Sequence, residues 1–413
     1  MTDAATLTAT TERSDARRSL TTLPTTMFLS PRRELRGWGE ALRIELPAPW
    51  VDHLDLVTDA LAAIAATSEL GDVPGSGPVA FAALPFDRTA PATFVVPAVL
   101  RGSTADGAHW ITTVSPPSPG SPEPAPDSAS ASDDGGVSPS PSEMTIRSVI
   151  AADTWCDLVA EATKRIAAGD LDKVVLAREL VVTADRPFDA HVLADRLAHA
   201  HPHAFRFDVD GFVGASPELL VSRFGDVVRA HPMAGTTPRT GDQDVDGRQA
   251  AELLHSHKNR DEHQITIDMV LDTLLEWTSF VDAEPVPSVV AAGSVQHLAT
   301  MVEGRLSEPA ASVLELVRSL HPTPAVGGFP REAALELIEE LEPDTRGRYA
   351  GPVGWVDASG NGAWAVGLRS VSVDGATARL FAGVGVVADS DPESELAETR
   401  AKFAATLGSI TRL

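Results

Sequence analysis

Three acidic segments of this chain combine residue types that could carry out one reaction. They read GASPELL (214–220), HKNRDEH (257–263) and DSDPESELAETRAK (389–402), and their glutamates include Glu218, Glu262, Glu395 and Glu398. Several glutamates around a small substrate predict either acid–base catalysis or a site for a hard cation. If 389–402 is helical, Glu395, Glu398 and Lys402 share one face, because residues three, four and seven apart are neighbours there.

Two residues are candidates for proton transfer. Lys173 begins the apolar run KVVL, where a lysine drawn into the interior could serve as a general base. The alternative is a lysine at a strand start that reaches solvent. Glu218 lies in an apolar stretch, which favours the protonated form that a general acid requires. The alternative is a carboxylate at a strand edge that pairs with Arg223.

A divalent cation could be held by Glu262, Glu395 and Glu398. Only oxygen ligands are offered, which favours Mg²⁺ over zinc or copper. The alternative is that all three are ordinary glutamates on helix surfaces.

Further candidates could bind an anionic ligand. Arg369 lies in the apolar stretch WAVGLRSVSV, where a buried guanidinium needs an anion, either a ligand carboxylate or a structural partner. Tyr349, the only tyrosine, could supply a hydroxyl or merely pack. Gly383 and Gly385 would let backbone amides approach an anion, although two glycines alone are a weak signal. His297, taken alone, fits a core histidine as well as a ligand-binding one.

Composition bounds the remaining possibilities. The 413 residues are 43% hydrophobic, enough for one large domain or two ordinary ones. A net charge of −25 argues against nucleic-acid binding, so any anion site must carry its own cations. The single cysteine, Cys156, excludes an intramolecular disulfide and a thiolate zinc cluster. With no apolar signal segment and no run of 18 apolar residues, we expect a cytoplasmic protein outside the membrane.

The chain divides by composition. Residues 1–22 are rich in threonine and alanine and are predicted to be disordered. Residues 23–114 mix strands with one helix and are expected to pack on the catalytic domain. Residues 115–143 are rich in proline, serine and acidic residues, which predicts a disordered insertion whose deletion should change little. Residues 145–413 form the segment with the motifs. There we expect helices over 153–168, 246–279 and 392–407, with long strands between them.

These motifs together resemble the chorismate-utilising enzymes, and within them the isochorismate synthases. The similarity runs from about residue 145 to the C-terminus, in order and with few gaps; residues 1–145 match only loosely. It rests on KVVLAR, GASPELL, HPMAGT, KNRDEH, SVQHL, HPTPAVGGFP, RGRYAGPVGW, WAVGLRSV and AGVGVVADSDPESELAET. The family fold implied is α+β, with large antiparallel β-sheets packed together and helices on the outside.

The resemblance implies a role for each candidate. Lys173 becomes the general base that activates water, and Glu218 the general acid that protonates the departing hydroxyl. Mg²⁺ is the implied cofactor, with Glu262 and Glu398 as direct ligands and Glu395 acting partly through water. The implied contacts with the substrate, chorismate, are Arg369, Tyr349, Gly383, Lys402, His297, Gly235, Thr236 and Ala325.

Two positions separate this chain from other members of the family. Aminating members carry a lysine in PIKGT, whereas this chain reads PMAGT with Ala234 there, which favours water as the nucleophile. Salicylate synthases, which continue to pyruvate elimination, usually have a threonine where this chain has Ala325. We therefore expect a monomeric isomerase acting on chorismate and isochorismate; the alternatives are a salicylate synthase and a non-catalytic chorismate-binding protein.

Overall fold

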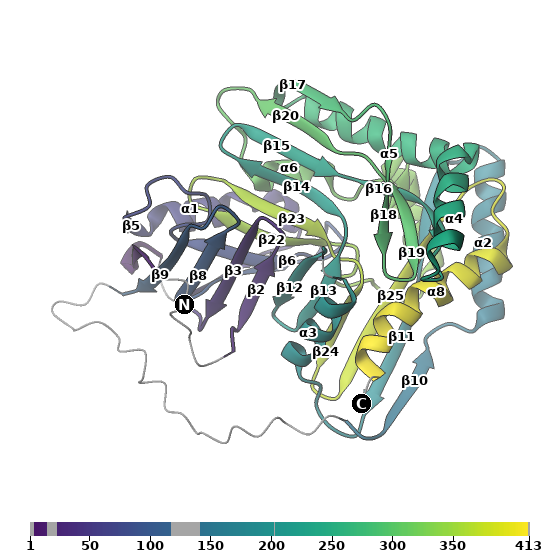
Figure 1. Ribbon diagram of the computed structural model, residues 1–413, viewed down its shortest axis with the longest axis horizontal. Coiled ribbons are helices and arrows are strands. Elements are labelled where there is room, and N and C mark those ends of the chain that lie inside the picture. Colours follow the sequence, from purple (N-terminus) through teal and green to yellow (C-terminus); the bar gives the residue numbers. More distant parts are fainter. Residues whose placement is uncertain (1–3, 15–22, 117–140, 202, 412–413) are drawn as a thin grey trace.

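The computed structural model describes residues 4–14, 23–116, 141–201 and 203–411. Within these residues, two large β-sheets and one small sheet carry helices on their outer sides (Figure 1). Apart from the pair β1 and β5, the paired strands run antiparallel. The α+β architecture predicted from the sequence is confirmed.

The first large sheet follows the order β10-β11-β25-β24-β13-β12-β2-β3-β8-β9-β1-β5, with β21 pairing β11 off this path. Its strands, in that order, are β10 (Met144–Ser148), β11 (Lys173–Ala184), β25 (Thr377–Val386), β24 (Ser370–Asp374), β13 (Phe212–Ser216), β12 (Phe205–Val209), β2 (Thr26–Leu29), β3 (Arg33–Trp38), β8 (Val99–Thr104), β9 (His109–Ser115), β1 (Thr8–Arg13), β5 (Ala65–Ser68) and β21 (Gly328–Phe329).

The second large sheet follows the order β17-β20-β15-β14-β23-β22-β6-β7-β4, and the small sheet the order β16-β19-β18. Their strands are β17 (Thr278–Ala283), β20 (Val302–Leu306), β15 (Val227–His231), β14 (Leu219–Phe224), β23 (Gly362–Val366), β22 (Pro352–Asp357), β6 (Val79–Ala83), β7 (Ala92–Val96), β4 (Leu42–Leu46), β16 (Met233–Pro238), β19 (Val295–Ala299) and β18 (Ser288–Ala292).

Strands from the N-terminal third extend both large sheets. β2 pairs with β12 in the first sheet, and β6 pairs with β22 in the second. Aromatic side chains from both sheets, among them Phe81, Phe207 and Trp355, share one buried cluster. The N-terminal strands are therefore built into the same two sheets as the C-terminal ones.

The disorder predicted for residues 1–22 is wrong for Thr8–Arg13, which form β1. This strand pairs with β9 and β5, and its alternate side chains Ala9 and Thr11 are buried. The Thr11 hydroxyl also hydrogen-bonds that of Thr112 at 2.9 Å. A threonine-rich segment suits a strand once neighbouring strands supply a buried face. Residues 1–3 and 15–22, and 117–140 of the predicted insertion, lie outside the described residues.

The helices cover the sheets from outside. They are α1 (Asp55–Ala63), α2 (Ala152–Ala167), α3 (Ala190–Ala200), α4 (Gln243–His255), α5 (His257–Leu275), α6 (Val313–Leu320), α7 (Arg331–Leu341) and α8 (Pro392–Thr411). In Figure 1, α8 runs alongside β25, and α2 and α3 pack against α8. None of the helices described is long and apolar enough to cross a membrane.

The single helix predicted for 246–279 is divided in two. α4 ends at His255 and α5 begins at His257, because Ser256 has an extended backbone and its hydroxyl accepts a hydrogen bond from the Asn259 amide. Serine at such a position caps the helix that follows. The last predicted turn is also wrong, since Thr278 already belongs to β17. The break directs the first turn of α5, with Lys258 and Glu262, toward the cavity described below.

Candidate active site

One cavity of about 230 Å³ lies where β11, β25, β16, α5 and α8 meet. Of the residues predicted to form a site, all but Lys173 line this cavity. They are Glu218, Gly235, Thr236, Glu262, His297, Ala325, Tyr349, Arg369, Gly383, Glu395, Glu398 and Lys402. Residues up to about 180 positions apart in the chain thus line one pocket, as expected if they form a single site.

Lys173 lies directly behind the cavity wall. Its side chain has no exposed surface, and its Nζ forms an ion pair with Glu262 Oε1 at 2.8 Å. Gly385 makes room for this pair, since a Cβ there would lie 2.7 Å from Glu262 Oε1 and 3.0 Å from Lys173 Cε. Burial raises the pKa of Glu262, but Lys173, Lys402 and Lys258 outweigh it, so the net pKa lies below the usual value. Glu262 is therefore a carboxylate at neutral pH.

Glu218 is placed to hold a proton. It follows β13 at Ser216-Pro217, is 2% exposed, and lines the cavity. Burial raises its pKa to about 8, although a hydrogen bond from the Met233 amide and the charge of Lys173 both favour the ionised form. A carboxylic acid that stays protonated at neutral pH can donate a proton to a leaving group. Glu218 is thus a protonated carboxyl group in the cavity wall, and its role as the general acid stays a prediction.

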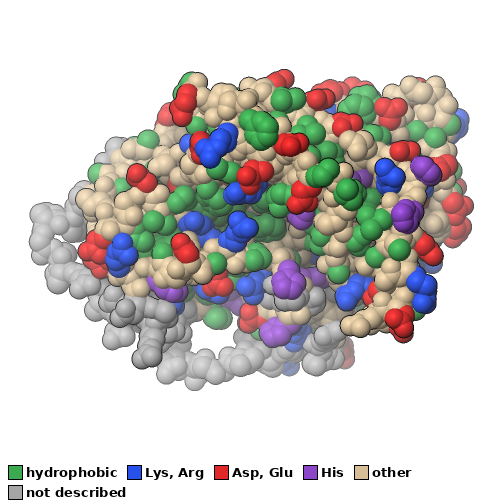
Figure 2. Space-filling view, turned by 45° about the horizontal axis from the view of Figure 1, so that its top comes forward, with side chains coloured by type: hydrophobic (Ala, Val, Ile, Leu, Met, Phe, Trp, Pro, Cys, Tyr) green, Lys and Arg blue, Asp and Glu red, His purple; other side chains and the backbone are tan. Residues whose placement is uncertain are grey.

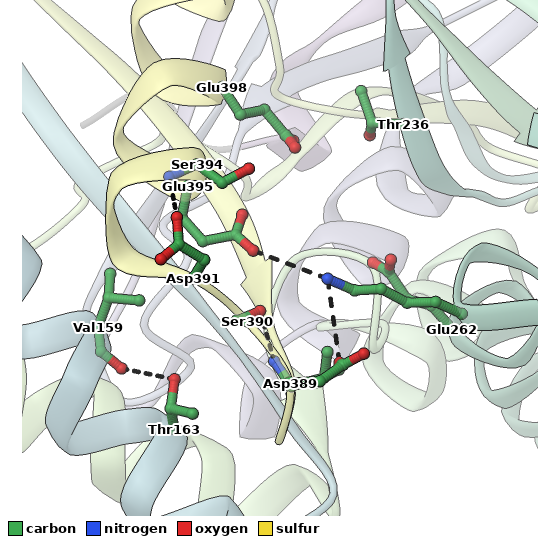
Figure 3. A network of polar contacts seen from close by, with 12 residues as sticks. Val159, Thr163, Thr236, Glu262, Asp389, Ser390, Asp391, Ser394, Glu395 and Glu398 are labelled. Carbon is green, nitrogen blue, oxygen red and sulfur yellow. Dashed lines mark hydrogen bonds and ion pairs between the residues drawn. The ribbon is translucent and has the colours of Figure 1, made fainter. Parts of the chain in front are cut away.

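Each of the other two glutamates faces a lysine. Glu395 and Glu398 project from α8 toward Glu262 (Figure 3). Lys402 Nζ lies 2.6 Å from Glu398 Oε1, and Lys258 Nζ lies 4.0 Å from Glu395 Oε1. Burial, reinforced by the charge of Glu398, raises the pKa of Glu395. Three carboxylates thus converge on one cavity, and lysines offset their charge.

The donor set suits Mg²⁺ in its chemistry. Glu262, Glu395 and Glu398 offer only carboxylate oxygens, which Mg²⁺ prefers. As placed, however, no three His, Cys, Asp or Glu side chains among the described residues are grouped closely enough to hold a metal ion. A cation bound here would have to draw the carboxylates away from their lysines.

Arg369 and Tyr349 form a second wall. Arg369 has a left-handed backbone with φ of 49°, is 8% exposed, and its Nε has no hydrogen-bond partner in the described part of the chain. Such strain and an unpaired buried donor are typical of a binding site. Burial lowers the pKa of Arg369 and raises that of Tyr349. A buried guanidinium with a free donor is the natural partner for a ligand carboxylate.

The Gly383 amide was expected to face an anionic ligand, but it is already hydrogen-bonded within the protein. Its N–H donates to Tyr349 Oη at 2.8 Å, and Lys402 Nζ donates to its carbonyl oxygen at 2.8 Å. The amide is therefore engaged inside the protein, and it fixes the tyrosine hydroxyl in the cavity wall. Gly383 lines the cavity, but as an anchor for Tyr349 and Lys402.

His297, Thr236 and Gly235 line the far side together. Burial lowers the pKa of His297 well below its usual value, so the ring is neutral, and its Nδ1 hydrogen-bonds Thr236 Oγ1 at 3.1 Å. The Thr236 amide donates to Asn259 Oδ1 at 3.1 Å. Gly235, with φ of 75°, lets the strand pass close to Asn259. Ala234 and Ala325 also line the cavity, and neither brings a reactive group.

Several lining residues were missed from the sequence. They include Val175, Lys258, Asn259, Arg346 and Ser394. Lys258 could have been found, because it lies one helical turn before Glu262 and therefore on the same face of α5. Arg346 begins the quoted motif RGRYAGPVGW, but the motif alone did not indicate its role, because its hydrogen-bond partners at Val175 and Val326 come from segments distant in the sequence.

Comparison with known proteins agrees with this arrangement. The family model described as "chorismate binding enzyme" matches residues 24–411. A Mycobacterium tuberculosis protein provisionally named isochorismate synthase MenF is 40% identical over 352 residues, 81% of this chain and 87% of its own. Isochorismate synthase MenF of Bacillus subtilis is 42% identical over 255 residues, 61% of this chain and 54% of its own.

Solved structures with a similar fold include another isochorismate synthase. The solved structure of the menaquinone-specific isochorismate synthase MenF of Escherichia coli superposes with a TM-score of 0.80, covering 98% of this chain and 95% of that one, at 24% identity. At that identity the likeness speaks for the fold alone. The match of the family model along nearly the whole chain decides membership, and this protein belongs to the family of chorismate-binding enzymes.

Proposed function

We propose that this protein is an isochorismate synthase, which converts chorismate reversibly into isochorismate. The observation that carries the proposal is a glutamic acid in the cavity wall, Glu218, whose pKa is raised to about 8, together with a buried lysine, Lys173, directly behind that wall. Relatives named isochorismate synthases, about 40% identical, support the same reaction.

The reaction needs one proton taken and one given. Water adds at C2 of the ring while its proton passes to Lys173, the ring double bonds shift, and the C4 hydroxyl leaves as water after receiving the proton of Glu218. Atoms balance, because one water enters and one leaves. A general base needs a free electron pair, so Lys173 would act as an amine that takes the proton of water while Glu262 stays beside it, 2.8 Å from Nζ.

The remaining residues hold the substrate. Chorismate carries two carboxylates, and Arg369, with its free Nε, is suited to bind one of them. The Tyr349 hydroxyl, fixed by the Gly383 amide, is suited to a further hydrogen bond. Lys402 and the neutral His297 complete the polar lining.

We include Mg²⁺ in this proposal. Glu262 and Glu398 would hold it, with Glu395 contributing partly through water. When bound, it would supply a positive charge for the second carboxylate of chorismate. Lys173 and Lys402 are paired with Glu262 and Glu398 in this structure. These lysines would therefore compete with Mg²⁺ for the two carboxylates.

Water is the favoured nucleophile over ammonia because Ala234, which lines the cavity, offers no amine. Ala325 lines the cavity as well, without a hydroxyl to assist further elimination. Salicylate synthesis remains the second candidate, because it begins with the same step.

A product assay tests the proposal. The protein is incubated with chorismate and Mg²⁺, and products are separated by chromatography with fluorescence detection. We expect isochorismate alone, approaching a fixed ratio to chorismate, with no turnover in EDTA. Salicylate with pyruvate would assign the chain to the second candidate, and no conversion would leave only a binding role.

A further inference from the structure

The strand that carries Lys173 has a gap along one edge. β11 pairs with β25 along one side over 174–183. On its other side it pairs with β21 at 173–174 and with β10 at 180–184, and within the described residues no strand pairs with that edge between them. Buried backbone groups need hydrogen-bond partners, so this gap must be filled in another way.

Backbone hydrogen bonds close the two ends of this gap, at the Val175 amide and at the Glu179 carbonyl. Two side chains fill the positions between them. The Ala177 amide donates to Glu342 Oε1 at 2.8 Å, and Arg346 Nη2 donates to the Val175 carbonyl at 2.6 Å. Glu342 and Arg346 are themselves joined by two contacts, 2.5 Å from Nη2 to Oε1 and 2.8 Å from Nε to Oε2. Their side chains are 7% and 2% exposed. This buried pair therefore supplies a donor and an acceptor where a strand would.

The same guanidinium also holds the loop beside the cavity. Arg346 Nη1 donates to the Val326 carbonyl at 2.8 Å, next to Ala325, and its plane packs over the Phe86 ring at 4.3 Å. Val175 and Lys173 lie two residues apart, hence on one face of β11. One side chain thus fixes both the strand of Lys173 and the loop of Ala325.

We propose that Arg346 and Glu342 are positioning residues of the active site, which set where Lys173 stands relative to the substrate. The inference rests on the proposed function, since Lys173 is the base only there. A planar guanidinium with five donors can bind a carboxylate and two carbonyls in fixed directions, which the single ammonium of lysine cannot. Neither residue needs to touch the reacting atoms.

The first test compares Arg346→Lys with Arg379→Lys. Arg379 pairs with Glu179, which lies on the same strand β11, but neither lines the cavity. We expect Arg346→Lys to lower kcat by about 10²-fold, as misplacement of a reacting group by about 1 Å does. KM should change less than about threefold, because substrate binding is retained. Arg379→Lys should leave kcat unchanged. An Arg346→Lys protein that only melts earlier, with normal kcat, would overturn the proposal.

A second test begins with the wild-type protein, so its first result does not depend on whether a variant folds. In hydrogen exchange of the wild-type protein, the Ala177 amide should exchange as slowly as the amides of its strand-paired neighbours Leu176 and Arg178. Fast exchange at Ala177 would show that Glu342 does not replace a strand there. In Glu342→Ala, which removes the acceptor, exchange at Ala177 should accelerate while that at Leu176 stays slow.

The two proposals fail in different ways. If the wild-type protein makes no isochorismate, the proposed function fails, whatever the exchange pattern shows. If it makes isochorismate, and Arg346→Lys and Glu342→Ala keep both kcat and slow exchange at Ala177, the positioning role alone is wrong.

Discussion

At the residue scale, burial acts on two glutamates of the cavity with opposite results. Among the described residues, Lys173 is the one cation that acts on Glu218, so burial dominates and raises the pKa of Glu218 to about 8. Glu262 faces three lysines, and their combined charge lowers its pKa although its side chain is mostly buried. One carboxyl therefore keeps its proton while the other stays ionised, which is the separation that acid–base catalysis requires.

The role of Lys173 is tested by replacing it. Lys173→Ala should reduce turnover by about 10²–10⁴-fold or more, the usual contribution of a general base. Binding of chorismate with Mg²⁺, measured by calorimetry, should be largely kept. Lys164→Ala removes a lysine that is 75% exposed on α2 and serves as the control. A Lys173→Ala protein with wild-type turnover would remove Lys173 as the base.

The pKa of Glu218 predicts a pH dependence. Because its folded-state pKa is raised to about 8, Glu218 is protonated below that pH and loses its proton as pH rises through it. We therefore expect kcat/KM to fall on the alkaline side of about pH 8. Glu218→Gln should lower kcat and abolish this alkaline fall, which a profile from pH 6 to 10 would reveal. An unchanged profile in Glu218→Gln would assign the acid elsewhere.

Gly385 is predicted to tolerate no side chain. Gly385→Ala would press its Cβ against Glu262 Oε1 and Lys173 Cε. We expect a loss of about 1–3 kcal/mol in the free energy of unfolding, typical of overpacking, together with a strong fall in activity. Gly408→Ala on α8, where a Cβ meets nothing within 4 Å, is the control. If thermal melting and turnover of Gly385→Ala match wild type, residue 385 does not lie as close to Glu262 and Lys173 as described here.

Residue types and motif order were enough to predict most of the charged side chains that line the cavity. Lys173, Glu218 and the three acidic residues of α5 and α8 were all named from the sequence. Which partner each one contacts could not be predicted, because it depends on how strands from distant segments align. The Gly383 amide illustrates this, since only the folded chain brings Tyr349 within hydrogen-bond distance of it.

At the element scale, the break between α4 and α5 links a helix cap to the cavity. Ser256 Oγ accepts hydrogen bonds from the Asn259 amide and from Asn259 Nδ2, and Asn259 Oδ1 in turn binds the Thr236 amide. The sequence pattern predicted one continuous helix here, because a single serine does not interrupt a run of good helix formers. Tertiary contacts around Asn259 decide the break.

Ser256 should therefore affect both stability and substrate binding. Ser256→Ala removes the cap and should lower the free energy of unfolding by about 0.5–2 kcal/mol. KM for chorismate should rise, since Asn259 and Thr236 lose their anchor. Ser312 caps α6 in the same manner but does not line the cavity, so Ser312→Ala should destabilise without changing KM. Equal KM values in both variants would contradict this link.

At the scale of the whole molecule, the chain must cross a wide sheet between β9 and β10. These strands follow one another in the described sequence but lie nine positions apart in the first sheet. At about 4.8 Å per strand, this is roughly 40 Å. The sequence alone suggested that 115–143 could be removed with little effect. The strand order predicts the opposite, because residues 114 and 144 joined directly could not span this distance.

The length of residues 117–140 should matter more than their sequence. We expect a glycine–serine replacement of equal length to keep the melting temperature and turnover, because a chain of this length can span roughly 80 Å. Complete deletion should lower the melting temperature sharply or prevent folding. A deletion variant that melts and turns over like wild type would show that the sheet order does not constrain this connection.

On the face shown in Figure 2, basic side chains are interspersed with acidic ones, despite the net charge of −25.

The central claim is that water attacks chorismate in this cavity and the C4 hydroxyl departs. The most direct measurement is the reaction in ¹⁸O-labelled water with Mg²⁺, followed by mass spectrometry of the separated products. The account predicts isochorismate that carries one ¹⁸O in its new hydroxyl, formed at least about 10²-fold more slowly by Lys173→Ala. Unlabelled isochorismate would contradict attack by water, and salicylate as the product would contradict the assigned reaction.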